Sequence, residues 1–172
     1  MIKFYAIKII IMAVIFIYLV IMLLMIFLLI GVVKMNEKQM IKVSEYLNVI
    51  YKLIKDFQIN SFFKVAFSSF IIKNRKEKIA FTNIKNNLIE GFFQQFHMDL
   101  FSNYDDFQYI FEAINILQEN QIIIIQNGII NVCKLIDVID DDFFKKKNVI
   151  DSLELIANMS EDSFVEEVLY NV

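Results

Sequence analysis

The sequence has no proline and only three glycines, one histidine and one cysteine among its 172 residues. The single cysteine, Cys133, cannot form a disulfide within the chain, which fits a reducing compartment. One histidine and one cysteine cannot supply the ligands of a usual structural zinc site. No phosphate-binding loop, dinucleotide-binding, zinc-protease or serine-hydrolase motif occurs. These absences argue against an enzyme and against a bound metal or cofactor.

Charge is divided unevenly along the chain, whose formal net charge is −3. Residues 1–34 contain three lysines and no acids, and residues 35–96 carry ten basic and five acidic side chains. Residues 97–172 contain four lysines and fifteen acids, which gives that part a net charge of −11. The acidic part of the chain is therefore the part furthest from the N-terminal segment.

An uncharged run of 25 residues, Ile9–Val33, occupies most of that N-terminal segment. A bilayer core requires about 20 such residues, so the run predicts a transmembrane helix within an anchor of residues 1–34. A cleaved signal peptide would have an apolar core of about 7–15 residues and a small-residue cleavage site. A buried helix of a soluble domain would have to be apolar on every side. Both alternatives fit the run less well.

Lysines on the two sides of the run predict its orientation. Two lysines precede it and four lie between Lys34 and Lys52, so the positive-inside rule favours a cytoplasmic C-terminal domain. Asn158-Met159-Ser160 matches a glycosylation acceptor, but such triplets often arise by chance in asparagine-rich chains. We therefore expect a single-pass protein with the lipid bilayer as its first partner.

Apolar residues at helical spacing recur through the rest of the chain. Ser44 and Thr82 are expected to cap helices, and Ser163 with Glu166 forms a predicted capping box. The expected helices cover residues 44–57, 61–72, 82–96, 105–118, 143–158 and 163–171, with a short strand at 79–81. In helix 105–118 the expected core stripe is Phe107, Ile110, Phe111, Ile114 and Leu117.

The stretch IIIIQNGIIN, residues 122–131, predicts a β-hairpin. Asn127-Gly128 favours a type I′ turn, in which both turn residues adopt positive φ. This turn places Gln126 opposite Ile129, and strand alternation then gives one fully aliphatic face. The second face mixes Ile122, Ile124 and Ile129 with polar residues.

The element order over residues 44–135 is read as helix, short strand, helix, helix and hairpin, and it resembles the winged-helix superfamily. That resemblance implies that the hairpin is the wing and helix 105–118 the recognition helix. The expected fold is thus mainly α with a small β-hairpin. A transmembrane helix precedes a winged-helix-like α+β domain over residues 35–136, and a C-terminal helical extension covers residues 137–172.

The expected recognition helix carries Asp105, Asp106 and Glu112 and no basic residue, which disfavours contact with phosphates. We therefore expect this domain to dock an unidentified protein, with a second copy of the chain left open as that partner. The alternative is a membrane-tethered nucleic-acid-binding protein that uses the basic segment Lys73–Lys78.

Two apolar surfaces are candidates for docking. One is a second stripe on helix 105–118, which either a partner or the C-terminal helices would cover; the other is the mixed face of the hairpin. The candidate residues are Tyr109, Ala113, Ile116, Ile122, Ile124 and Ile129. A catalytic pair of His97 with Cys133 is disfavoured, because the two residues are distant in sequence and such a pair also needs an orienting group. Cation binding by the acidic run 137–142 is disfavoured because the run lacks the ligand spacing and central glycine of a calcium loop.

Overall fold

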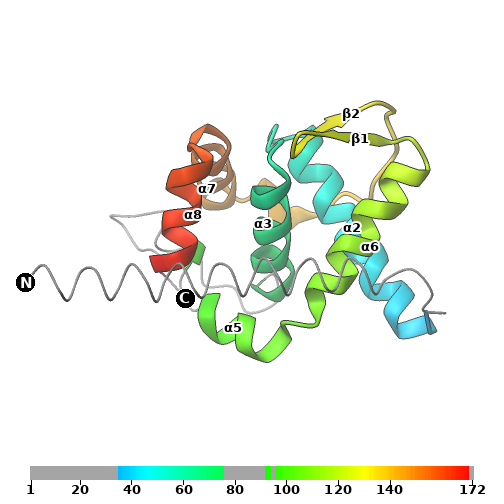
Figure 1. Cartoon of the computed structure of the whole chain (residues 1–172), viewed down its shortest axis with the longest axis horizontal. Helices are drawn as coiled ribbons and strands as arrows, with labels where there is room; N and C mark the ends of the chain where they lie inside the picture. Colours follow the sequence, from blue (N-terminus) through cyan, green and yellow to red (C-terminus); the bar gives the residue numbers. More distant parts are fainter. Residues whose placement is uncertain (1–34, 76–91, 94–95, 171–172) are drawn as a thin grey trace, which may run out of the picture. The chain divides into compact units, whose positions relative to one another are not determined.

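The computed structural model describes residues 35–75, 92–93 and 96–170, which belong to one compact unit, Met35–Val172. The unit is mainly helical with one two-stranded antiparallel hairpin (Figure 1). Its elements are α2 (Glu37–Lys55), α3 (Phe62–Arg75), α5 (Phe96–Asn103), α6 (Asp106–Glu119), β1 (Ile123–Gln126), β2 (Ile129–Val132), η2 (Asp142–Lys145), α7 (Lys147–Asn158) and α8 (Glu161–Tyr170).

Several predictions concern residues outside these ranges. The uncharged run Ile9–Val33, the strand at 79–81 and most of the helix at 82–96 are among them. Within the described ranges, none of the helices combines the length and the apolar character needed to cross a bilayer.

Helix α2 begins seven residues before its predicted start, so the expectation that Ser44 caps it is wrong. Asn36 is the N-cap: its side chain accepts a hydrogen bond from the Gln39 amide at 3.0 Å. The Gln39 side chain accepts in turn from the Asn36 amide at 2.9 Å. This capping box satisfies two of the amides that lack partners at a helix start. The first turns were missed because their exposed residues follow no clear apolar period.

The other helix boundaries differ from the predictions at several points. Helix α3 continues to Arg75, beyond the predicted end at residue 72, and the predicted helix 143–158 is divided into η2 and α7. Residues 96–103 form α5, whereas the prediction ended a helix at Phe96. Helix α8 begins at Glu161, and Ser160 Oγ accepts from the Ser163 amide at 3.1 Å, so the predicted capping box at Ser163 and Glu166 is wrong. Helix α6 agrees with its prediction to within one residue, and its five predicted core residues are all buried.

Phenylalanine rings make up the centre of the core and join α3, α5, α6 and α8. Phe70 of α3 stacks on Phe107 of α6, with ring centroids 4.9 Å apart. Phe67 lies 5.8 Å from Phe96 of α5, and Phe63 meets Phe164 of α8 edge to face at 6.0 Å. Aromatic pairs at such distances add to the stabilisation from apolar burial. Helix α8 therefore packs into the same core as α3, α5 and α6.

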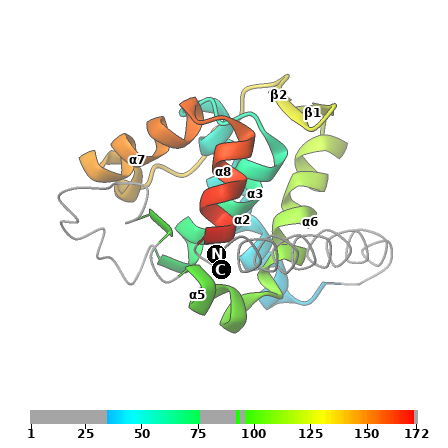
Figure 2. The ribbon, with the colours of Figure 1, turned by 60° about the vertical axis from the view of Figure 1, so that its left-hand side comes forward.

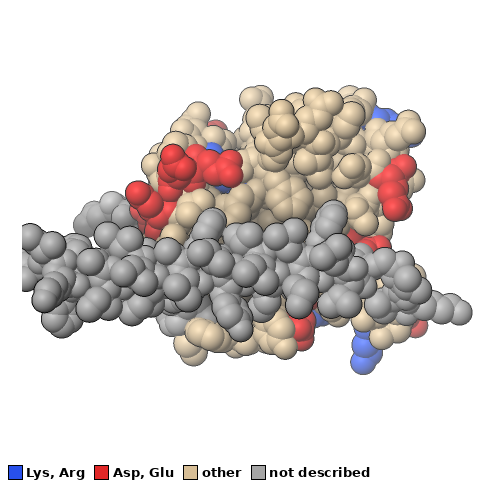
Figure 3. Space-filling view, viewed as in Figure 1, with Lys and Arg blue, Asp and Glu red and all other residues tan. Residues whose placement is uncertain are grey.

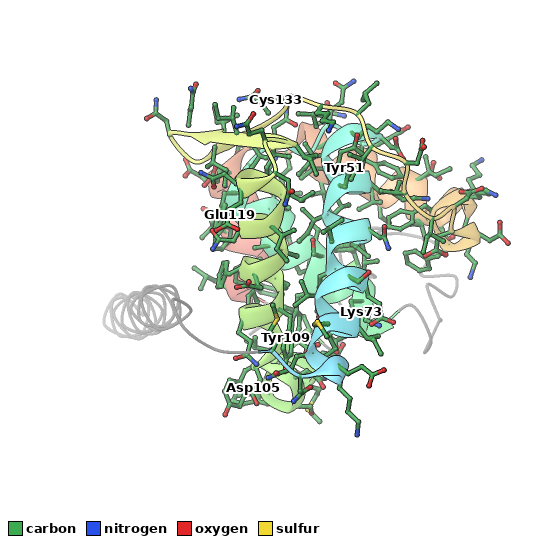
Figure 4. The ribbon with its side chains drawn as sticks, turned by 90° about the vertical axis from the view of Figure 1, so that its right-hand side faces the viewer. Tyr51, Lys73, Asp105, Tyr109, Glu119 and Cys133 are labelled. Carbon is green, nitrogen blue, oxygen red and sulfur yellow. The ribbon has the colours of Figure 1, made fainter. Side chains whose placement is uncertain are left out.

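Helices α2 and α6 pack side by side and run in the same direction (Figure 4). Near their N-terminal ends, Lys42 Nζ lies 2.8 Å from Asp106. At the other end of α2, the Tyr51 hydroxyl accepts a 3.0 Å hydrogen bond from the Ile136 amide and so fixes the segment after β2. The hairpin lies at the C-terminal end of α6, whereas α5 lies at its N-terminal end (Figure 2).

Candidate docking surface

The hairpin forms as its turn sequence predicts. Asn127 and Gly128 have φ of 52° and 76°, the left-handed values that a type I′ turn requires. The register pairs Gln126 with Ile129 and Ile125 with Ile130, which confirms the prediction. Ile123 and Ile130 are fully buried, so the aliphatic face is the one that packs on the helices.

The outer edge of β2 is occupied by the residues that lead into α3. The Phe62 amide donates to the Gly128 carbonyl at 2.8 Å, and the Ile130 amide donates to the Asn60 carbonyl at 2.7 Å. Ser61 between them forms an antiparallel bridge with Ile129. A short extended segment, residues 60–62, thus covers this edge.

The outer edge of β1 has a different environment. Ile123 and Ile125 lie opposite Val132 and Ile130 in pairs whose backbone groups point away from the partner strand. The neighbouring Cys133 amide donates to the Ile122 carbonyl at 2.8 Å, which fixes this alternation. In the described part of the chain the sheet has two strands, so none pairs with β1 on this side. An edge with unpaired amides and carbonyls can accept a further strand.

The second face of the hairpin, which we call the hairpin back face, consists of Ile122, Ile124, Gln126, Ile129 and Asn131. Ile124 is 42% exposed and Ile129 is 51% exposed, whereas Ile122 is half-buried. Uncharged residues cover the region of the hairpin in Figure 3, while acidic side chains gather over α8. The hairpin back face is therefore partly apolar, uncharged and accessible beside the open edge of β1.

The predicted second stripe on α6 is not an open surface. Ala113 is fully buried, so its assignment to a docking surface is wrong. Helices α2 and α6 pack along each other. Tyr109 and Ile116 are half-buried, and Lys42 Nζ of α2 lies 5.0 Å from the centroid of the Tyr109 ring. Helix α2, and not the C-terminal helices, lies beside Tyr109 (Figure 4).

A buried polar cluster fixes α2 against α6 and hence positions the hairpin that follows α6. Asp106 is buried and accepts from Tyr46 Oη at 2.8 Å as well as from Lys42 Nζ. Burial, together with the charge of Asp106, raises the pKa of Tyr46 far above its usual value, so the phenol stays a hydrogen-bond donor. The hydrogen bond to Asp106 raises the pKa of Lys42. Charge-assisted hydrogen bonds of this kind are stronger than neutral ones.

A cleft of about 610 Å³ opens between the C-terminal end of α2, η2 and α7. Its cations are already paired: Lys145 Nζ lies 2.6 Å from Asp140 and 2.9 Å from Asp142, and Lys52 Nζ lies 3.4 Å from Asp140. The hydrogen bond from Lys145 lowers the pKa of Asp140. The acidic run thus serves ion pairs, and Asp141 caps η2 by accepting from the Phe143 amide.

The remaining predicted candidates are dispersed. The side chain of His97 lies outside the described residues, and Cys133 is exposed beyond the end of β2. Among the described residues, no group of three or more potential ligands could hold a metal ion. In the basic segment Lys73–Lys78, the Lys73 ammonium is paired with Glu45 at 2.6 Å, and residues 76–78 lie outside the described ranges.

Comparison of the chain with protein-family models, with curated proteins and with solved structures found no match.

Sequence reasoning missed the polar contacts that hold this surface in place. The Asn36-x-x-Gln39 spacing could have located the start of α2, because it is a capping-box pattern. Lys64, the single charge in the apolar helix 61–72, could have indicated a buried cation with a specific partner. Nothing in the sequence indicated that residues 60–62 would meet β2.

Proposed function

We propose that this chain is a single-pass membrane-anchored protein–protein interaction module, an adaptor or accessory subunit of a larger assembly, and not an enzyme. Its partner docks on the open edge of β1 and on the hairpin back face. The observation that carries the proposal is the asymmetry of the two outer edges of the hairpin. Residues 60–62 cover the outer edge of β2, whereas no strand in the described part of the chain pairs with the outer edge of β1, beside exposed Ile124 and Ile129.

The chemistry of this surface favours a protein partner in extended conformation. An added strand would hydrogen-bond to the outward amides and carbonyls of Ile123 and Ile125. Its alternate side chains would cover Ile124 and Ile129 and remove apolar surface from water. No lysine or arginine belongs to the hairpin back face, so nothing there would attract a nucleic acid backbone.

The proposal also includes the membrane anchor of residues 1–34, with the domain on the cytoplasmic side. Its support is the uncharged length of Ile9–Val33 and the lysines that follow it. For the domain we propose a winged-helix-like arrangement. The succession of α2, the bridge at Ser61 and α3, and of α6 followed directly by the hairpin, supports it; α5 lies between α3 and α6 as an additional helix.

The test compares full-length variants after affinity isolation from detergent-solubilised membranes. Ile129→Lys places a charge on the docking surface at an exposed position, so the fold should be retained. The amount of stoichiometric partner recovered with the variant should fall at least tenfold. Leu135→Lys is the matched control, since Leu135 is 72% exposed but lies beyond the hairpin. Equal recovery of the partner with both variants, or recovery of none with the unmodified chain, contradicts the proposal.

A further inference from the structure

A second apolar surface lies at the opposite end of the domain from the hairpin. Helix α5 and the residue after it expose Met98, Phe101 and Tyr104, and Phe101 is 77% exposed. The spacing of three residues places these side chains on one side of the helix. The first turns of α2 expose Met40 and Ile41. None of these five side chains belongs to the docking surface described above.

The two groups lie at the same end of the domain. Lys42, which follows Ile41, contacts Asp106 at 2.8 Å, and Asp106 lies two residues after Tyr104. Figure 4 shows the N-terminal end of α2 beside Asp105, and Figure 1 shows α5 at the same end. Tyr51 and Cys133 lie at the other end (Figure 4). Helix α2 has 19 residues, which corresponds to a length of about 28 Å between the two ends.

The short connection between the uncharged run and α2 indicates that this surface contacts the membrane. The uncharged run ends at Val33 and α2 begins at Glu37, so only three residues separate them. Even fully extended, this connection reaches no more than about 14 Å. If residues 9–33 span a bilayer, the N-terminal end of α2 must therefore lie close to the lipid headgroups.

We propose that this end of the domain, formed by Met40, Ile41, Met98, Phe101 and Tyr104, inserts into the membrane interface. The inference rests on the membrane anchor of the proposed function. Tyrosine is suited to this depth because its ring leaves water while its hydroxyl stays hydrated, and the wholly apolar ring of phenylalanine can enter the acyl boundary. The same end carries Lys38 and Lys42 but also Glu37, Asp105 and Asp106, so the apolar side chains and not net charge provide the attraction.

This geometry has a consequence for the docking surface. Contact of α5 and the first turns of α2 with lipid fixes the tilt of the domain. The hairpin, at the far end of α2, is then held away from the bilayer and open to a partner. A domain attached only by the connection 34–36 would have no fixed tilt.

The test uses the full-length chain in vesicles of phosphatidylcholine with brominated acyl chains, which quench a fluorophore that enters the lipid. One sample carries the label on native Cys133, which is exposed at the far end and is the only cysteine. The other carries it on Phe101→Cys in a Cys133→Ser background, and Met98→Cys repeats the measurement at a second position. We expect at least twofold quenching of the labels at 98 and 101 and none at 133.

Equal quenching at both ends, or no quenching at 98 and 101, overturns the inference. Labels at 98 and 101 that are shielded from aqueous iodide yet not quenched by bromine also overturn it. In that case protein, either a second copy or the uncharged run itself, covers this surface. Extraction of the same vesicles in alkaline carbonate separates the two proposals. If the chain stays with the lipid but its labels are not quenched, only the insertion of this end of the domain is refuted. If the chain washes off the vesicles, the membrane anchor is refuted as well.

Discussion

The hydroxyl of Tyr46 donates a 2.8 Å hydrogen bond to the carboxylate of Asp106, which joins α2 to α6 across 60 positions of the chain. Both groups are buried, and Lys42 supplies the balancing charge. Because the hairpin follows directly after α6, this contact helps to set where the docking surface stands relative to the core. The contribution of this hydrogen bond to the free energy of unfolding can be measured.

Tyr46→Phe should lower the free energy of unfolding by about 1–2 kcal/mol. The ring stays in place, but a buried carboxylate loses one of its two donors. Chemical denaturation of the full-length chain in detergent, followed by circular dichroism, measures the change. Tyr170→Phe is the matched control, because Tyr170 is exposed and its hydroxyl meets water. The same loss in both variants would show that the bond to Asp106 is not the cause.

Lys64 is buried in α3 and its ammonium donates to the carbonyls of Ile156 at 2.9 Å and Ala157 at 3.4 Å, and to that of Met159. These carbonyls lie at the C-terminal end of α7, where a cation also meets the negative end of the helix dipole. Burial lowers the pKa of Lys64, which shows that the charge is costly there. Two effects therefore oppose each other when the charge is removed.

Lys64→Met should destabilise the fold by about 1 kcal/mol in spite of its greater hydrophobicity. The variant removes the cost of burying a charge but leaves the carbonyls at the end of α7 without their donor, and the second effect is the larger. Lys38→Met, at an exposed position of α2, is expected to change the stability little. A rise in the unfolding temperature of Lys64→Met would contradict the role given to this ammonium.

The ion pair of Asp140 with Lys145 predicts a defined dependence on pH. The pKa of Asp140 is lowered in the folded chain from its ordinary 3.8, mainly by the hydrogen bond from Lys145. The pair therefore contributes stability above that ordinary value, and the contribution is lost as the pH falls through the folded pKa. Unfolding temperatures of the unmodified chain and Asp140→Asn should differ at pH 7 and converge at acidic pH. A difference that persists after full protonation would exclude this explanation.

Gly128 should be sensitive to any side chain although space is available. Its φ is +76°, and a Cβ there would meet no atom within 4 Å. Gly128→Ala is therefore expected to cost about 1 kcal/mol through backbone strain alone. Asn127→Gly, at the neighbouring residue with φ of 52°, should cost much less because glycine tolerates this conformation. Equal stability of the two variants would argue against strain in the turn.

The features that the sequence predicted correctly are those encoded by neighbouring residues. The turn at Asn127-Gly128 sets the register of the hairpin, and the helical period places five core residues on α6. These signals arise within a few residues of each other, so no knowledge of the tertiary fold is needed to read them.

The features that were missed depend on packing between distant segments. Ala113 continues an apolar stripe, but only the path of α2 decides that the stripe is covered. The partners of Lys64 and Asp106 lie more than 50 residues away from them in the chain. Likewise, the open edge of β1 could be distinguished from the covered edge of β2 only after residues 60–62 were placed beside Ile129.

The most direct test of the docking surface is photo-cross-linking in intact membranes. A benzophenone amino acid replaces Ile124 on the hairpin back face or, as a control, Leu155 on the exposed side of α7. We expect position 124 to give one adduct of defined mass that is weak or missing from position 155. This adduct should disappear when Ile129→Lys is added. Should position 124 yield no adduct, or the same products as position 155, the hairpin is not where this protein meets its partner.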